Sequence, residues 1–247
     1  GAGMMECKKA LVEADGDMDK AVDFLRERGL AAAAKKATRI AAEGVVLPYY
    51  DAEAKKGVVV EVNSETDFVA KNEKFMSFVE GVAKTILATN PADVEALKEE
   101  KFDGTDRTVT ETLNDLVLSI GENMKVRRFE RMDGIVSTYI HGGGSVGVMV
   151  GFDVADESKA ATAEFDAMGK NVAMQIAAMN PIAIDEDGVS EEIKQKEIEV
   201  AIDKTKAEQV QKAVEVALKK AGLNPAHVDS EDHMESNMAK GWITAED

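Results

Sequence analysis

Two short stretches of helical periodicity open the chain. In residues 4–14 the apolar side chains recur every three or four positions and share one face: Met4, Cys7, Leu11 and Ala14. A second stretch covers residues 19–28 and points Val22 and Leu25 inward, and we expect Gly29 to end it. The pattern therefore predicts a small helical unit in residues 1–29.

The segment after Gly29 has the composition of a linker. Residues 30–42 are rich in Ala and contain several basic residues, which predicts a helical connection. Two helices as short as those before it bury too little apolar surface to fold alone. We therefore expect a further helix to precede Gly1.

A repeated pattern begins at residue 43. Residues 133–181 align with residues 43–91 without a gap, and each copy predicts a strand, a tight connection, a second strand and a helix. Identical residues fall at matching positions: Gly44 and Gly134, Tyr49 and Tyr139, Phe75 and Phe165, Asn90 and Asn180. A unit that occurs twice predicts a duplicated core, and we expect an α+β fold.

The two copies are continued by different elements. The helix of the first copy gathers its apolar side chains on one face: Phe75, Phe78, Val79, Val82, Ala83 and Ile86. A further helix, which Gly121 ends, and a strand at 125–132 come next. The second copy has no equivalent of this strand before the chain stops, so we expect its subdomain to be incomplete.

The last part of the chain predicts one long helix. Apolar residues recur with heptad spacing between Ile193 and Ala221, which favours a helix that packs on another helix. Its partner can lie in the same chain, as the other half of a hairpin, or in a second copy, which would give a homodimer. We therefore divide the chain into five segments: 1–29, 30–42, 43–132, 133–188 and 189–247.

Charge and cysteine content narrow the functional classes. The formal net charge is −17, and an acidic surface repels phosphate backbones, so we expect no nucleic-acid partner. No run approaches the roughly 18 apolar residues that a membrane span needs, so we expect no membrane partner. Cys7 is the single cysteine, which excludes a disulfide scaffold and suits a reducing compartment.

Three segments have a superficial likeness to ligand sites. The acidic turn around Asp17 lacks the Gly and Glu of a calcium loop, and Asp17 is better placed as a helix N-cap. Residues 142–145, GGGS, lie between two predicted strands and lack the residues of a phosphate loop, so a hairpin is the better interpretation. Nothing fixes a metal geometry in the cluster of His227, Asp229, Asp232, His233 and Glu235. We expect no catalytic residue, no metal and no cofactor.

The turn at residues 62–72, VNSETDFVAKN, places apolar side chains where the chain should meet water. In the second copy the positions of Thr66-Asp67-Phe68-Val69 are occupied by the polar sequence Asp156-Glu157-Ser158-Lys159, so the fold does not require an apolar pair there. Two interpretations remain open. Phe68 can be a hydrophobic staple beneath a helix that Asp67 caps, or an apolar side chain presented to a partner.

Several motifs, in this order along the chain, resemble the elongation factor Ts family. They are GAGMMECKKAL (1–11), AAEGVV (41–46), VNSETDFVAKNEKF (62–75), IGENMKVRR (120–128) and YIHGGGSVGV (139–148). The resemblance covers essentially the whole chain. It implies an N-terminal ubiquitin-associated-like helical domain, two related core subdomains and a helical hairpin inserted in the second. It also implies that the first helix, the closing strand and a C-terminal contact segment are missing.

The resemblance implies a role for the segment Thr66, Asp67, Phe68 and Val69. In the family the acid and the aromatic side chain enter the nucleotide domain of elongation factor Tu near its magnesium site, and GDP is lost. Further positions match contacts of the family with this partner: Met4, Met5, Lys8, Ile120, Gly121 and His141.

The function implied is that of a guanine-nucleotide exchange factor. The protein would bind elongation factor Tu in its GDP-bound and nucleotide-free forms and would not be an enzyme. The alternative is a non-enzymatic interaction or scaffold module built on a ubiquitin-associated-like domain. The resemblance implies a cytoplasmic protein of a bacterium, with an organelle as the other possible source.

Overall fold

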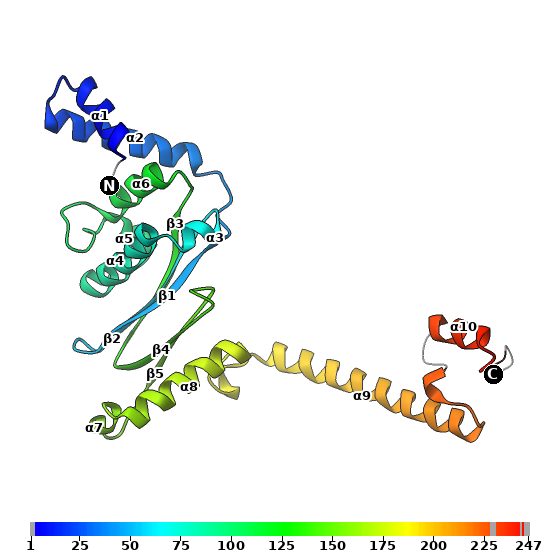
Figure 1. Ribbon diagram of the computed structural model, residues 1–247. Coiled ribbons are helices and arrows are strands. Elements are labelled where there is room, and N and C mark those ends of the chain that lie inside the picture. The colour runs from blue at the N-terminus through cyan, green and yellow to red at the C-terminus, as the bar shows by residue number, and fades with distance from the viewer. Residues whose placement is uncertain (1–2, 228–230, 243, 245–247) are drawn as a thin grey trace. The chain divides into compact units, whose positions relative to one another are not determined.

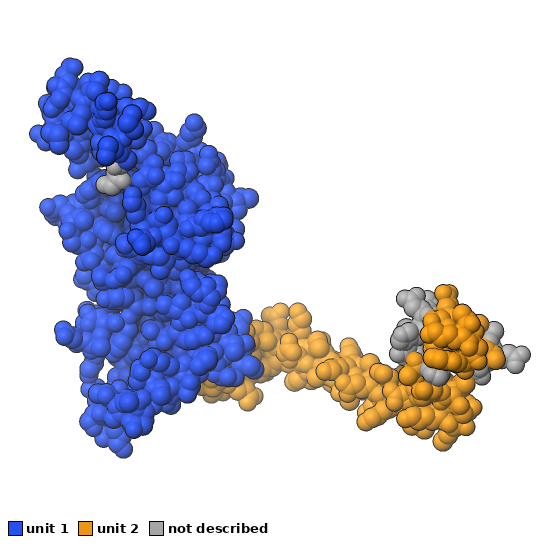
Figure 2. All heavy atoms as spheres, in the orientation of Figure 1, with its two compact units in different colours: residues 1–180 blue, residues 181–247 orange. Residues whose placement is uncertain are grey.

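The computed structural model describes residues 3–227, 231–242 and 244. Contacts between Cα atoms divide the chain into two compact units, residues 1–180 and residues 181–247 (Figure 2). The predicted α+β class is confirmed, because small antiparallel sheets and many helices make up the structure. The finer division into five segments stays a prediction.

The two N-terminal helices form where the pattern predicted them. Helix α1 spans Met4–Glu13 and helix α2 spans Met18–Lys36. The Asp17 carboxylate caps α2 by accepting hydrogen bonds from the backbone N–H groups of Asp19 and Lys20, as expected. The core between the two helices consists of three small buried residues, Ala10, Ala14 and Ala21. Leu11, Phe24 and Leu25 pack against this core.

The predicted inward position of Val22 and the stop at Gly29 are wrong. Val22 is exposed, whereas Leu25 packs against the core of the two helices as predicted. Gly29 lies inside α2, buried against helix α6 (Val109–Ile120), and a Cβ there would lie 3.5 Å from the carbonyl oxygen of Asn114. Because packing on α6 supports the helix at this point, α2 continues to Lys36 and takes in half of the predicted linker.

The first core subdomain is built on an antiparallel sheet of three strands. Strands β1 (Glu43–Asp51), β2 (Lys56–Ser64) and β3 (Lys125–Asp133) lie in the order β1-β2-β3, and all three were predicted. A register shift in the β2–β3 pairing occurs between Glu61 and Val62.

Four helices complete this subdomain: α3 (Asp67–Ala70), α4 (Glu73–Thr89), α5 (Val94–Glu99) and α6. The apolar face predicted for α4 is buried against the sheet and forms the main core with the valines of β2. Figure 1 shows α4, α5 and α6 gathered on one side of the three strands. Asn72 caps α4, and Gly121 ends α6 with a φ of 92°, as its sequence predicted.

The second subdomain repeats the first in reduced form. Strands β4 (Ile135–His141) and β5 (Val146–Phe152) pair antiparallel, and helices α7 (Glu157–Ala160) and α8 (Ala163–Met179) follow. No third strand joins this sheet among the described residues, as expected. The two subdomains meet directly, because the Val46 N–H donates a hydrogen bond of 2.8 Å to the Gly144 carbonyl oxygen.

The second unit is helical. A 3₁₀ turn at Glu186–Gly188 leads into the predicted long helix, α9 (Glu191–Lys220), and a 3₁₀ turn at Pro225–His227 and helix α10 (Glu231–Ala239) follow. No residue of α9 is buried, and its heptad positions Ile193, Val200 and Val214 are exposed. The pairing of α9 with another helix, in the same chain or in a second copy, stays a prediction.

Candidate functional site

The segment that stood out in the sequence forms a one-turn helix with one apolar side chain inside and one outside. Thr66 is the N-cap of α3, because its side chain accepts a hydrogen bond from the Val69 N–H. Val69 and Ala70 are buried in the main core, whereas Phe68 is 82% exposed. Burial of Val69 thus holds the turn in place while the ring of Phe68 faces solvent.

This geometry excludes one of the two interpretations of Phe68. A hydrophobic staple would bury the ring, so the staple interpretation is wrong. Asp67 is also not the cap, since Thr66 caps α3 and Asn72 caps α4. Val69, which was grouped with the presented residues, anchors the turn from within.

Asp67 stands beside Phe68 as a charged group. Its carboxylate accepts a hydrogen bond of 2.8 Å from the Lys71 ammonium group, one helical turn away. This hydrogen bond and the charge of Lys71 hold the pKa of Asp67 below its usual range and raise the pKa of Lys71. The turn therefore presents an ionised carboxylate and an apolar ring side by side at neutral pH.

Two acidic residues fix the backbone on which Phe68 is carried. Glu122 accepts from the Thr66 N–H at 3.1 Å and from the Thr66 hydroxyl at 2.8 Å. In return, Glu65 accepts from the Asn123 N–H at 2.6 Å. We call these four residues the loop clasp. It escaped the sequence analysis, because its two halves lie far apart in the chain and only the GEN sequence after α6 marks one of them.

The second subdomain contains the same turn without the apolar residues. Helix α7 occupies the position that corresponds to α3, and Asp156 caps it. None of its residues is buried, and Glu157 instead pairs with Lys55 of the first subdomain at 2.6 Å. The comparison within one chain confirms that this turn can form without a Phe-Val pair.

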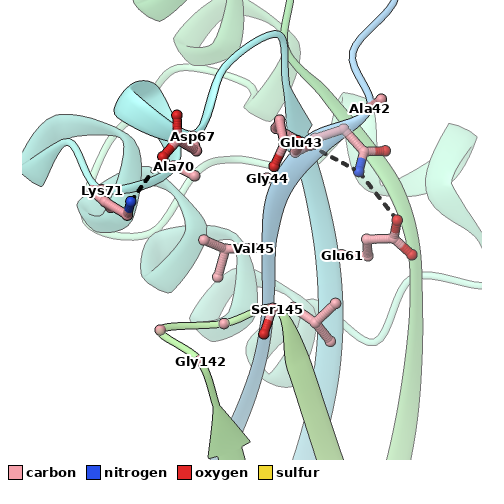
Figure 3. Close-up of a pocket in the computed structure, with 14 residues that line it drawn as sticks. Ala42, Glu43, Gly44, Val45, Glu61, Asp67, Ala70, Lys71, Gly142 and Ser145 are labelled. Carbon is pink, nitrogen blue, oxygen red and sulfur yellow. Dashed lines mark hydrogen bonds and ion pairs between the residues drawn. The ribbon is translucent and has the colours of Figure 1, made fainter.

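A cavity of about 320 Å³ separates α3 from the glycine hairpin of the second subdomain. Asp67, Ala70 and Lys71 line it on one side, and residues 142–145 line it on the other (Figure 3). His141, one of the expected contact residues, ends β4 directly before this hairpin, and its Nδ1 lies 2.9 Å from the Tyr139 hydroxyl. His141 therefore directly precedes in sequence the residues that line this cavity.

The remaining expected contact residues lie on other elements. Met4, Met5 and Lys8 are on α1, where Met4 and Lys8 line an apolar hollow together with Leu11. Ile120 and Gly121 end α6 immediately before Glu122, so the loop clasp joins them to Thr66.

The sequence of the chain matches a known protein family. The family model for Elongation factor TS matches residues 65–221, which begin at the loop clasp and include α3. The chain belongs to the elongation factor Ts family.

Relatives in several bacteria support this membership over the full chain. The chain is 49% identical to Elongation factor Ts of Bacteroides fragilis and 48% identical to that of Parabacteroides distasonis. Each alignment covers 100% of this chain and 72% of the relative. Elongation factor Ts of Clostridium perfringens is 53% identical over 81% of this chain and 65% of the relative.

The other candidate sites give no support for a bound group. Within the described part of the chain, no three His, Cys, Asp or Glu side chains are grouped so that they could hold a metal ion. Of the predicted cluster near the end of the chain, Asp229 and the side chains of His227, Asp232 and His233 lie outside the described residues. None of the described helices is both long enough and apolar enough to cross a membrane.

Proposed function

We propose that this member of the elongation factor Ts family is a guanine-nucleotide exchange factor. It binds elongation factor Tu with GDP, disturbs the magnesium and nucleotide site, and promotes GDP release during translation elongation in the bacterial cytoplasm. The observation that carries the proposal is Phe68, an aromatic ring that is 82% exposed on a turn held in place by the buried Val69 and by the N-cap hydrogen bond of Thr66. A well-packed protein keeps such a ring in water at a cost, which a partner pocket removes.

The chemistry of exchange requires no covalent step. The exchange factor needs only to bind the nucleotide-free partner more tightly than the GDP-bound partner. By thermodynamic linkage, exchange factor and GDP then weaken each other's binding by the same factor. The protein therefore acts through surface contacts, and a protein partner tolerates its net charge of −17, which a phosphate backbone would not.

Asp67 and Phe68 supply two different contributions. Removal of Mg²⁺ from a diphosphate site removes the main charge that balances the phosphates, so a disturbance of the Mg²⁺ site strongly weakens the binding of GDP. The Phe68 ring becomes buried in an apolar environment of the partner. The neighbouring Asp67 carboxylate brings a negative charge to the site where Mg²⁺ normally balances the charge of the phosphates. The hydrogen bond from Lys71 lowers the pKa of this carboxylate further.

The further contacts extend the docking surface over three other elements. We assign Met4, Met5 and Lys8 of α1 to the GTPase surface of the partner, and Ile120, Gly121 and His141 to contacts from the core. Met4 and Met5 are both exposed, which supports this role. Because Thr66 and Glu122 are hydrogen-bonded, the contacts at residues 66–68 and 120–121 form one continuous surface.

Release of labelled GDP from elongation factor Tu tests the proposal. A fluorescent GDP analogue is loaded on elongation factor Tu with Mg²⁺, and its release is followed after excess unlabelled GDP is added, with and without this protein. We expect release to accelerate in proportion to protein concentration until it saturates. If release is unchanged while the two proteins bind, the protein is an interaction module and the proposed exchange function is wrong.

A further inference from the structure

The loop clasp consists of two carboxylates that each bind the backbone of the opposite loop. Glu122, in the loop after α6, binds the backbone and side chain of Thr66, and Glu65 binds the backbone of Asn123. The Asn123 side chain, which is buried, donates in addition to the Arg39 carbonyl oxygen at 2.7 Å. Hydrogen bonds to ionised carboxylates are stronger than those between neutral groups, so the loops are joined firmly.

The Thr66 hydroxyl is the point at which Glu122 acts on α3. A hydroxyl has one proton to donate and lone pairs with which to accept. Glu122 accepts the hydrogen bond that this hydroxyl donates, at 2.8 Å, so the hydroxyl turns a lone pair toward the Val69 N–H, whose nitrogen lies 3.4 Å away. Glu122 also accepts a hydrogen bond from the Thr66 N–H, so one carboxylate binds both hydrogen-bond donors of the N-cap residue. The orientation of the N-cap, and with it the start of α3, is therefore set from outside the helix.

We infer that Glu122 is a positioning residue for exchange, which holds the Thr66–Val69 turn in the orientation that presents Phe68. This inference rests on the proposed exchange function. Glu122 acts through Thr66 on a ring that the first subdomain does not otherwise enclose. A helix of one turn has too few internal hydrogen bonds to keep its own orientation, so contacts from outside determine it: burial of Val69 beneath it and the Glu122 carboxylate at its start.

A matched control is present in the same subdomain. Thr108 and Glu111 form the same kind of threonine–glutamate pair at the N-terminus of α6, with distances of 3.0 and 3.1 Å between side chain and backbone. Glu111→Ala removes a comparable cap without touching α3. It shows how much exchange is lost through a general loss of stability alone.

The experiment combines stopped-flow GDP release with a double-mutant cycle. Glu122→Ala should lower kcat/KM for release by about tenfold, the usual size for the loss of a hydrogen-bonded carboxylate. Glu111→Ala should leave kcat/KM within about twofold of the parent. In the Phe68→Ala background, Glu122→Ala should have a clearly smaller effect, since much of its action passes through this ring and only the part that passes through Asp67 remains. Equal losses in both backgrounds would overturn the positioning role.

A second pair of variants keeps the test decisive if Glu122→Ala folds poorly. Thr66→Val removes the hydroxyl at nearly constant volume and should reproduce the loss, whereas Thr66→Ser keeps the hydroxyl and should lose clearly less activity than Thr66→Val. Full activity of Thr66→Val would contradict the inference.

Amide hydrogen exchange in the free protein separates this inference from the proposed function. Glu122→Ala should speed exchange of the Thr66 and Val69 amides while the amides of β2 stay protected. If the parent protein does not release GDP from elongation factor Tu, the proposed function is wrong. The exchange rates of the Thr66 and Val69 amides still show whether Glu122 orders the turn. Unchanged protection of both amides would overturn the inference by itself.

Discussion

Phe68→Ala separates the binding role of this side chain from its role in folding. The ring is 82% exposed, so its removal should change the free energy of unfolding by less than about 0.5 kcal/mol. Burial of a Phe side chain supplies roughly 1.5–3 kcal/mol, and the exposed 82% of this residue can still supply its share when a partner covers the ring. Phe68→Ala should therefore weaken the stabilisation of the exchange transition state by roughly 1.2–2.5 kcal/mol. Since about 1.4 kcal/mol corresponds to a tenfold change, kcat/KM for GDP release should fall roughly 8- to 70-fold.

The assay for Phe68→Ala needs two measurements and two controls. Urea unfolding gives the change in stability, and stopped-flow release of a fluorescent GDP analogue gives kcat/KM. Met179→Ala removes another exposed apolar side chain, on α8, and should leave both quantities unchanged. Phe75→Ala removes a ring that is fully buried beneath the sheet and should cost about 3–5 kcal/mol of stability. A similar stability loss for Phe68→Ala, or an unchanged kcat/KM, would refute the reasoning.

Three further predictions concern the framework of the site. Burial alone would raise the pKa of Glu61, but hydrogen bonds from Arg128, Asn63 and Arg127 outweigh it and hold the pKa below the ordinary value. The stability that Glu61 contributes is therefore present above its unfolded pKa of about 4.3 and is lost as the pH falls through the lower folded value. Thermal unfolding from pH 7 to 3 should accordingly show a shallower acid decline for Glu61→Gln, and an identical decline would contradict this. Gly144→Ala should cost about 1–3 kcal/mol in urea unfolding, because the new Cβ would lie 2.7 Å from Val45 at a φ of 105°. Gly143→Ala, at a φ of 67° with no atom within 4 Å, is its control and should cost less, so equal losses would disprove the clash. Gly29→Ala should stabilise the protein by about 0.5–1 kcal/mol, because Gly29 lies in a helix interior with ordinary contact distances around it. Destabilisation measured by urea unfolding would contradict this prediction, because it would mean that the added methyl group does not fit against α6.

The periodicity of the sequence was sufficient for the strands and for most of the long helices. The apolar face of α4, the strands of both copies and the long helix α9 follow from spacing alone, because each buries or could bury one continuous face. Alignment of the two copies also identified residues 66–69 as unusual, since the second copy is polar at all four positions.

Spacing could not say which of two adjacent apolar residues points outward. Phe68 and Val69 are both apolar and lie within a single turn, too short for any periodicity to be read. Their opposite exposure depends on the core beneath Val69 and on Glu122, which reaches Thr66 from a distant part of the chain. Gly29 was misassigned for a related reason, since contact with α6 keeps a helix going through a residue that usually ends one.

The most direct test of the account is the affinity of this protein for elongation factor Tu in two states. Isothermal titration calorimetry gives the dissociation constant for nucleotide-free elongation factor Tu and for the complex with GDP and Mg²⁺. The account predicts tighter binding to the nucleotide-free form, by the same factor by which this protein weakens GDP binding. Equal affinity for the two forms would contradict it, because a ligand that binds both states equally shifts neither.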